Sequence, residues 1–193
     1  MNEMSLWTPI VLASASPRRQ ELLKEAGIAF VVRPAQIPEV PLGTESAIRF
    51  AERMAREKAR AVLPTIGAGV VLGADTVVWI DHEVLGKPEN AEDAARMLRR
   101  LSARKHRVTT GVCLLGKGFE DVRSATTVVR FLPLSEAAIQ DYIRSGEPMD
   151  KAGAYAIQGG AARWVKAVEG DYTNVVGLPV PLVRRMLLEH GIV

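Results

Sequence analysis

The order of apolar and polar positions along the chain predicts strands and helices that alternate. Short apolar or β-branched runs, which are typical of buried strands, occupy residues 10–13, 69–80, 84–85, 108–115, 122–131 and 164–168. Apolar positions that recur every three or four residues predict helices at residues 17–26, 44–63, 90–101, 135–146 and 179–190. This alternation predicts an α/β protein with about five helices and six or more strands in one mixed sheet system.

Residues at the expected helix ends support these boundaries. Pro17 stands at the first position of its helix, and Gly27 stands just past its end. Thr44 or Ser46 can cap the second helix, and Pro64 ends it because a proline disfavours helical backbone in the residue before it. One helix therefore follows the first strand directly, and another precedes the long apolar run at residues 69–80.

Composition narrows the class of protein. The chain has 193 residues, of which 48% are hydrophobic and 24% charged, near the average for a soluble globular protein. We therefore expect residues 1–193 to form a single domain, and we exclude disordered, collagen-like and disulfide-stapled chains. The net charge of +3, from 25 basic and 22 acidic residues, permits a phosphate-bearing ligand without demanding nucleic acid.

The number of cysteines and the length of the apolar runs indicate the cellular compartment of the protein. The single cysteine, Cys113, excludes an intrachain disulfide and suits a reducing compartment. It lies in an apolar run, which favours a buried structural thiol over a nucleophile. Residues 1–9 lack the basic and apolar regions of a signal peptide, and no window reaches the ~18 apolar residues of a membrane span. We therefore expect a cytoplasmic protein without a membrane partner.

The strand-to-helix turn Ser-Ala-Ser-Pro-Arg-Arg at residues 14–19 has the groups of an anion site. Ser14 and Ser16 supply hydroxyls, and a helix N-terminus presents free N–H groups. Arg18 and Arg19 lie in the first turn, where their charge opposes the helix dipole unless an anion binds between them. The alternative is an ordinary helix cap followed by solvated arginines.

A lysine interrupts the apolar stripe of the second helix. Ala47, Ala51 and Val62 recur on one face of this helix, and Lys58 lies on the same face. A lysine on a buried face needs a partner, or its ammonium group must extend to water. Lys58 therefore either snorkels to solvent or reaches a cleft to meet phosphate.

Asp75 stands inside a run that is otherwise suited to a fully buried strand. An ionised carboxylate in such a place is costly unless it is paired, metal-bound or catalytic. Gly73 and Ala74 leave room for another group to approach the backbone beside it. The alternative is a structural acid that accepts hydrogen bonds from neighbouring N–H groups.

Two loops add weaker candidates. Lys87 lies in a stiff Gly-Lys-Pro loop. Residues 147–159 combine charges and small residues with the amide of Gln158, which can form hydrogen bonds with the edge of a nucleobase. For both, the alternative is a solvent-exposed loop without a ligand, and residues 170–179 are interpreted as structural. No histidine has metal-ligand spacing or pairs with Cys113, so the sequence supports neither zinc nor Cys-His catalysis.

Taken in order, these segments resemble the Maf family of nucleoside triphosphate pyrophosphatases. The matching segments are Ser-Ala-Ser-Pro-Arg-Arg at 14–19, Glu-Lys-Ala at 57–59, Gly-Ala-Asp-Thr at 73–76, Gly-Lys-Pro at 86–88, Asp-Lys-Ala-Gly-Ala-Tyr at 150–155 with Gln158, and Val-Gly-Leu-Pro at 176–179. The resemblance implies a curved mixed sheet with flanking helices and two lobes around a cleft, as in inosine-triphosphatase-like proteins. It also implies a homodimer that converts a nucleoside triphosphate and water to the monophosphate and pyrophosphate with Mg²⁺ or Mn²⁺.

Within this family, the residues that mark specificity suggest the branch that prefers dTTP and UTP. The markers correspond here to Arg18, Thr76 and Gln158, whereas a sister branch prefers 7-methyl-GTP. The family often has Asp-Ile-Asp-Glu after the first helix, where this chain has Gln-Ile-Pro-Glu at residues 36–39. Glu39 keeps one carboxylate of that segment, so a metal role there rests on fewer acids.

The resemblance and the residues together lead to a hypothesis for the mechanism. Asp75 acts as general base on the attacking water, and Asp75 with Glu39 holds the metal. Four cations stabilise the departing pyrophosphate, and they are Arg18, Arg19, Lys58 and Lys87. Ser14, Ser16, Thr76 and Gln158 bind the substrate.

Two alternatives remain open. One is a pyrophosphatase for 7-methyl-GTP or for a broader set of modified nucleotides. The other is a non-catalytic nucleotide- or DNA-binding regulator of division. Only Arg99-Arg100 and Arg184-Arg185 form further basic doublets, and this dispersed pattern disfavours a DNA-binding face.

Overall fold

The computed structural model of the protein describes residues 9–193, so the expectation about a leader at residues 1–9 falls almost wholly outside it. Within this part of the chain, seven strands form one mixed sheet in the order β2-β1-β3-β5-β6-β7, with β4 paired to β3. The strands are β1 (Ile10–Leu12), β2 (Phe30–Val32), β3 (Val70–Ile80), β4 (Glu83–Leu85), β5 (Lys105–Gly116), β6 (Phe119–Phe131) and β7 (Val165–Glu169).

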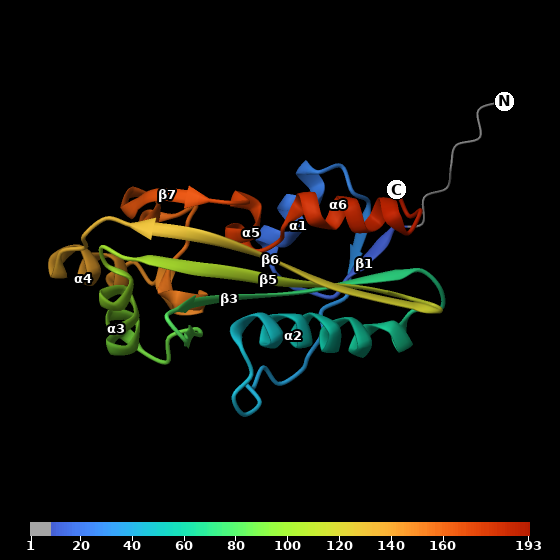
Figure 1. Ribbon diagram of the computed structural model, residues 1–193, viewed down its shortest axis with the longest axis horizontal. Coiled ribbons are helices and arrows are strands. Elements are labelled where there is room, and N and C mark those ends of the chain that lie inside the picture. Colours follow the sequence, from blue (N-terminus) through green and yellow to red (C-terminus); the bar gives the residue numbers. More distant parts are fainter. Residues whose placement is uncertain (1–8) are drawn as a thin grey trace.

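The helices lie on both faces of this sheet (Figure 1). The α-helices are α1 (Pro17–Glu25), α2 (Ala47–Val62), α3 (Ala91–Leu101), α4 (Glu136–Arg144), α5 (Tyr172–Val176) and α6 (Val180–Glu189). Helix α2 runs along one face of the long strands, whereas α1, α5 and α6 lie on the other face and α3 and α4 gather at one end (Figure 1). No helix within residues 9–193 has the length and apolar composition needed to span a bilayer.

Most predicted elements are confirmed, with differences at their ends. The hairpin strands β5 and β6 extend beyond the predicted 108–115 and 122–131, because their pairing continues from Lys105 opposite Arg130 to Gly116 opposite Phe119. Strand β2 and helix α5 were not predicted, since a three-residue strand and a five-residue helix are too short to show a periodicity. Residues 147–159, for which an exposed loop was one interpretation, contain two short 3₁₀ helices at Glu147–Asp150 and Ala152–Ala154, and a third follows at Gly160–Trp164.

Two glycines bring α2 unusually close to the sheet. A Cβ atom at Gly73 would lie 2.1 Å from the carbonyl oxygen of Ala55, and one at Gly111 would lie 2.3 Å from that of Ala51. The group that approaches the backbone beside Gly73, as the sequence predicted, is the backbone of α2. Since Lys58 follows Ala55 by one turn and Asp75 follows Gly73 on the same strand face, this contact also sets the distance between their side chains.

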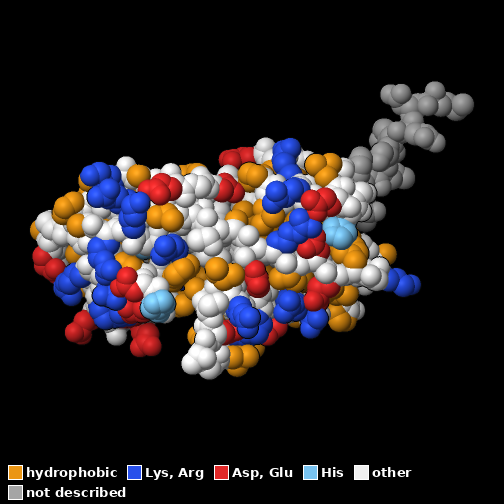
Figure 2. All heavy atoms as spheres, in the orientation of Figure 1, with side chains coloured by type: hydrophobic (Ala, Val, Ile, Leu, Met, Phe, Trp, Pro, Cys, Tyr) orange, Lys and Arg blue, Asp and Glu red, His pale blue; other side chains and the backbone are white. Residues whose placement is uncertain are grey.

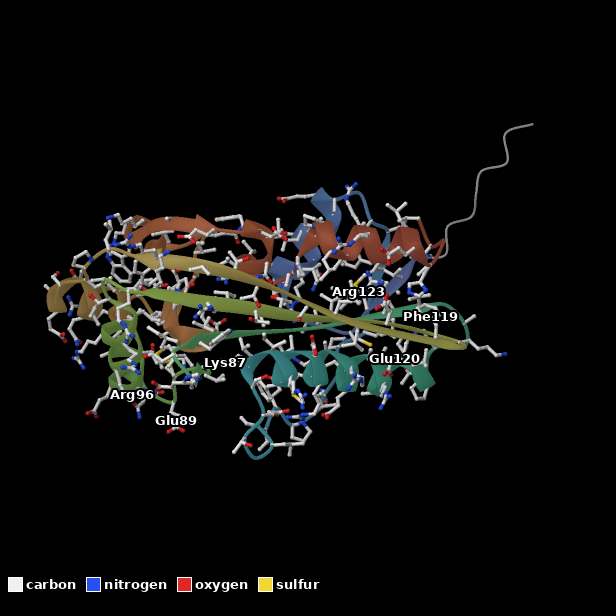
Figure 3. All side chains as sticks on the ribbon, viewed as in Figure 1. Lys87, Glu89, Arg96, Phe119, Glu120 and Arg123 are labelled. Atoms are coloured by element: carbon white, nitrogen blue, oxygen red, sulfur yellow. The ribbon has the colours of Figure 1, made fainter. Side chains whose placement is uncertain are left out.

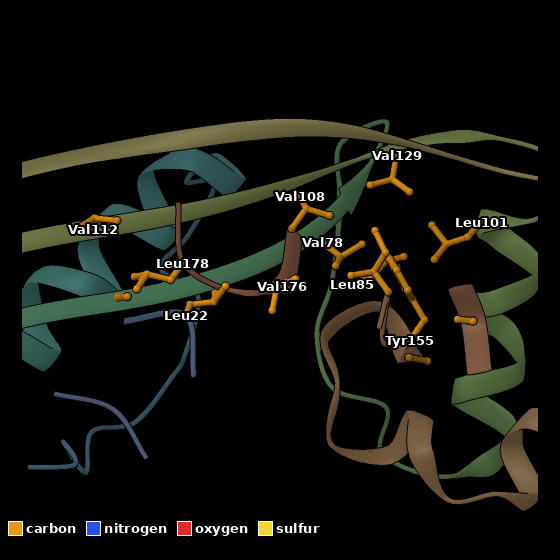
Figure 4. Packing of buried hydrophobic residues seen from close by; sticks show 14 of the residues in the cluster. Leu22, Val78, Leu85, Leu101, Val108, Val112, Val129, Tyr155, Val176 and Leu178 are labelled. Carbon is orange, nitrogen blue, oxygen red and sulfur yellow. The ribbon is translucent and has the colours of Figure 1, made fainter. Parts of the chain in front are cut away.

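The core is divided by the sheet into separate layers. The largest buried cluster lies on the face opposite α2 and contains residues such as Val78, Val108 and Leu178 (Figure 4). Cys113 belongs instead to a smaller cluster under α2. Burial raises the pKa of its thiol to about 12, so Cys113 is the inert structural thiol that the sequence predicted.

Candidate active site

The site lies at an unpaired stretch of β3. On one edge this strand pairs with β5 from Val70 to Trp79. On its other edge, β1 pairs only as far as Leu72, and β4 begins to pair at Val78. Residues 73–77 therefore have no strand on that edge among the described residues. Because successive side chains point to opposite faces of a sheet, a group that enters this gap reaches side chains from both faces.

A cleft of about 480 Å³ occupies this gap. Its walls come from segments far apart in the sequence, namely the turn before α1, helix α2, strand β3, the loop after β4 and the segments at residues 150–157 and 175–177. The lining residues include nine of the ten candidates named from the sequence, namely Ser14, Ser16, Arg18, Arg19, Glu39, Lys58, Asp75, Thr76 and Lys87. The tenth candidate, Gln158, is exposed and does not line the cleft, although its neighbour Ile157 does.

Lys58 joins two carboxylates on the α2 side of the cleft. Its Nζ lies 2.7 Å from Asp75 Oδ1 and 2.6 Å from Glu39 Oε1. Both Lys58 and Asp75 are buried, at 8% and 7% exposure, whereas the Glu39 side chain is 47% exposed. The lysine on the apolar stripe therefore does not snorkel to solvent, and its charge is matched inside the cleft.

These contacts set the charge states of the two acids. Burial raises the pKa of Asp75 above its ordinary value, against the pull of Lys58 and Arg19. For Glu39, burial acts in the same direction, but the hydrogen bond and charge of Lys58, with Lys87 and Arg19, outweigh it and lower the pKa. The cations thus favour the charged form of Glu39, whereas burial works against the charged form of Asp75.

The turn before α1 presents hydroxyls and one arginine to the cleft. Ser16 caps α1 by accepting a hydrogen bond from the backbone N–H of Arg19 at 3.5 Å. Ser14 Oγ accepts bonds from the Ser16 N–H at 3.2 Å and from Arg19 Nη1 at 3.1 Å. Arg18 is half-buried at the cleft wall, whereas Arg19 is buried and its guanidinium donates to Ser14, Thr76 and Gly177.

Lys87 supplies an exposed cation to the cleft. It lies exposed on the loop between β4 and α3, in the space between that loop and α2 (Figure 3). Lys151, between the 3₁₀ helices at Glu147–Asp150 and Ala152–Ala154, also lines the cleft and pairs with Asp150. Lys151 belongs to the Asp-Lys-Ala-Gly-Ala-Tyr motif but was not predicted as a site residue, because it lies in a segment with no regular periodicity.

One end of the cleft is apolar. It is lined by Val78 and Val108 from the long strands and by Tyr155, Ile157 and Val176 from the C-terminal segments. Figure 4 shows several of these side chains together, with Val176 and Leu178 lying against the strands. The cleft therefore joins a cationic end, suited to phosphates, to an apolar end, suited to a planar ring.

The carboxylates of Asp75 and Glu39 can hold a divalent ion only when waters or substrate phosphates supply further oxygen donors. Residues 9–193 contain no cluster of three or more His, Cys, Asp or Glu side chains arranged to hold a metal. Asp75 and Glu39 nevertheless converge on one atom, Lys58 Nζ. Mg²⁺ is commonly bound by one or two carboxylates together with waters and substrate phosphates, and this donor set matches that arrangement.

Comparison with known proteins agrees with this geometry. The sequence matches the family of Maf-like proteins over residues 9–190. The chain belongs to the Maf-like family. A Maf-like relative from Koribacter versatilis, named dTTP/UTP pyrophosphatase, is 52% identical over 192 residues, which cover 100% of both chains. Another of the same name, from Symbiobacterium thermophilum, is 51% identical and covers 94% of each chain.

A solved structure also confirms the fold of this Maf-like chain. The Staphylococcus aureus Ham1 protein matches 95% of this chain and 100% of its own, with a TM-score of 0.50 and 13% sequence identity. At that identity the likeness concerns the fold alone. The mixed α/β architecture with flanking helices, predicted from the sequence, is thereby confirmed.

Proposed function

We propose that this Maf-like protein hydrolyses dTTP and UTP to the monophosphate and pyrophosphate. The observation that carries the proposal is the buried Asp75–Lys58 pair, with 2.7 Å between its charged atoms, inside a cleft that also holds Arg18 and Lys87. The name dTTP/UTP pyrophosphatase borne by relatives about half identical over the whole chain supports the substrate and the reaction.

The catalytic base in this proposal is Asp75. Its Oδ1 accepts from Lys58, and no described side chain or backbone N–H donates to its Oδ2. Oδ2 can therefore take the proton of a water molecule whose oxygen forms a bond to the α-phosphorus. The bond between the α-phosphorus and the bridging oxygen breaks, and pyrophosphate leaves with the electron pair.

The cations stabilise the charge that develops on this leaving group. Lys58, Arg18 and Lys87 line the same cleft from three different elements. Preorganised cations in a partly water-free site lower the barrier more than the same charges would in water. Hydroxyls of Ser14 and Ser16 and the N-terminus of α1 supply further donors to the phosphates.

The metal proposed for this reaction is Mg²⁺ or Mn²⁺, held by Asp75 and Glu39 together with the phosphates. When bound, such an ion supplies Lewis-acid neutralisation of the phosphate charge. The nucleoside is proposed to occupy the apolar end, with Thr76 and Gln158 near the base. Gln158 would have to turn inward over Ile157 to contribute, because its side chain is exposed.

We also propose a cellular compartment and the binding partners of this protein. A cytoplasmic location is proposed because the one cysteine is a buried, unpaired thiol. Lys and Arg side chains are interspersed with acidic ones on the face in Figure 2, which favours a nucleotide over a nucleic acid as partner. A homodimer is proposed from the family resemblance.

A substrate panel tests the proposal and its rivals together. Pyrophosphate release is measured from dTTP, UTP, 7-methyl-GTP and the other common nucleoside triphosphates, with Mg²⁺ or Mn²⁺. Highest kcat/KM for dTTP and UTP supports the proposal, whereas a preference for 7-methyl-GTP assigns the chain to the sister branch. Absence of hydrolysis together with salt-dependent binding of duplex DNA favours the regulator.

A further inference from the structure

We propose that Arg19 is a positioning residue, which orients the Ser14 hydroxyl toward the phosphates, rather than a cation that binds the triphosphate directly. The inference rests on the proposed function, because it concerns the same cleft. It departs from the expectation drawn from the sequence, in which Arg19 stabilises the departing pyrophosphate.

The guanidinium of Arg19 is shared among three segments of the chain. Nε donates to the carbonyl oxygen of Gly177 at 2.8 Å, Nη1 to Ser14 Oγ at 3.1 Å and Nη2 to Thr76 Oγ1 at 3.0 Å. Each nitrogen therefore has its own acceptor. The acceptors belong to the turn before α1, to β3 and to the loop between α5 and α6, and all three residues line the cleft.

The acceptors of Arg19 are neutral, which separates its role from that of Lys58. No carboxylate of residues 9–193 forms an ion pair with Arg19, whereas Lys58 has two such partners. Burial lowers the pKa of Arg19, and the charges of Asp75 and Glu39 oppose that effect from a distance. The structure thus uses the shape of the guanidinium, whose donors form a rigid planar fork that a lysine cannot reproduce.

The consequence for Ser14 follows from counting its hydrogen-bonding groups. A serine hydroxyl has two acceptor lone pairs and one hydrogen. The lone pairs accept from Arg19 Nη1 and from the Ser16 N–H. The hydrogen of Ser14 is then the group left for the cleft, so Arg19 makes Ser14 a donor to a phosphate oxygen.

The same count applies to Thr76. Its hydroxyl accepts from Arg19 Nη2 and lies 2.9 Å from Thr110 Oγ1 and 3.2 Å from the Gly177 carbonyl. The one hydrogen of Thr76 therefore has two acceptors within reach, the Gly177 carbonyl oxygen and Thr110 Oγ1, and both belong to the protein. The Thr76 hydroxyl is therefore committed to the protein, and its influence on substrate choice passes through the position of Arg19 and of the loop at Gly177.

A double-mutant cycle tests this assignment. Arg19→Lys keeps the charge but loses the fork, and Ser14→Ala removes the donor that Arg19 orients. We expect each single variant to lower kcat/KM for dTTP about 30-fold or more. The kcat/KM of the double variant should be no more than about threefold below that of the less active single variant. Affinity for inorganic pyrophosphate, measured by calorimetry, should show the same coupling.

The matched control is Arg18→Lys, the neighbouring arginine, which has no hydrogen bond to Ser14. The fold-loss of kcat/KM caused by Arg18→Lys should multiply with the fold-loss caused by Ser14→Ala in the corresponding double variant. If the losses of Arg19→Lys and Ser14→Ala also multiply, or if Arg19→Lys keeps most of the activity, Arg19 acts through its charge and the proposal is overturned.

Folding and substrate identity are tested separately. Thermal unfolding checks that each variant is folded. If Arg19→Lys does not fold, the isosteric Thr76→Val takes its place in the cycle, because it removes one of the acceptors that hold the Arg19 guanidinium. The same coupling with Ser14→Ala is expected. If the wild-type chain hydrolyses neither dTTP nor UTP, the proposed function fails. The coupling in pyrophosphate affinity then still decides the role of Arg19, and a wild-type chain that does not bind pyrophosphate overturns that role too.

Discussion

Lys58 Nζ lies 2.7 Å from Asp75 Oδ1, between a helix and a strand whose backbones nearly touch. Both residues are buried, so the pair is held in surroundings that strengthen electrostatic interactions. This geometry gives Asp75 one oxygen fixed by a cation and one oxygen free to take a proton.

Replacing Asp75 removes the proposed base. Asp75→Asn should lower pyrophosphate release from dTTP by about 10³-fold, within the range expected for general base catalysis, while the chain stays folded. Pyrophosphate release and circular dichroism measure the two effects. Asp81→Asn, at an exposed turn, is the matched control and should keep wild-type turnover. Near-wild-type activity of Asp75→Asn would sink the assignment.

Replacing Lys58 should alter the pH profile as well as the rate. Lys58→Gln is expected to cost about 3 kcal/mol in the transition state, or roughly 100-fold in rate. Burial already raises the pKa of Asp75, and loss of the opposing Lys58 charge raises it further. The acidic limb of the kcat/KM profile should therefore move to higher pH. Lys117→Gln, an exposed lysine, should leave the profile unmoved, and an unmoved limb in Lys58→Gln would contradict the pairing.

The close approach of α2 to the sheet predicts a strong effect of one methyl group. A Cβ at Gly73 would lie 2.1 Å from the Ala55 carbonyl, so Gly73→Ala must push α2 outward and separate Lys58 from Asp75. We expect a loss of about 1–3 kcal/mol in the free energy of unfolding and a larger loss of activity. Gly67→Ala, where the added Cβ meets open space, is the control in denaturant titrations. Equal stability of the two variants would show that α2 does not depend on this glycine.

His106 should make stability fall in acid. It is buried against Tyr155, with 2.8 Å between His106 Nε2 and the Tyr155 hydroxyl, and burial lowers its pKa from 6.5 to about 3. Between these values the unfolded chain binds a proton that the folded chain does not, so acid favours unfolding. The free energy of unfolding should lose up to about 1.4 kcal/mol per pH unit through this group.

Urea titrations from pH 7 to pH 4 measure that slope. His106→Gln should show a shallower dependence than the wild type, whereas His82→Gln, at an exposed position, should retain the wild-type slope. If His106→Gln and the wild type lose stability in parallel, His106 is not the group responsible.

Gln158 provides a test of where the nucleobase of the substrate lies. Because it is exposed next to the cleft-lining Ile157, we expect it to contact the base only after substrate binds. Gln158→Ala should then raise KM for dTTP and UTP severalfold with little change in kcat. Gln140→Ala, on α4 outside the cleft lining, is the control, and an unchanged KM for Gln158→Ala would remove it from the site.

Much of the fold was predictable because the elements carry local signals. Pro17 and the Ser16 cap begin α1 where the sequence predicted it, and Asn90 caps α3 by accepting from the Asp93 N–H. Strand β2 and helix α5 were missed because both are short and depend on pairing and packing with distant residues. The candidates for the site were found as polar residues in apolar surroundings, which is a local anomaly.

The amino-acid sequence by itself was enough to single out the residues that we propose carry the chemistry. Lys58 and Asp75 stand out because a charge on a buried face is costly without a partner, and that cost depends only on the local pattern. Tertiary structure decided how these residues are used. The gap in the pairing of β3 opens one cleft to both faces of the sheet, and the contact at Gly73 sets the distance between Lys58 and Asp75. The orientation of Arg19 toward Gly177, 158 residues away, likewise depends on packing that no local pattern encodes.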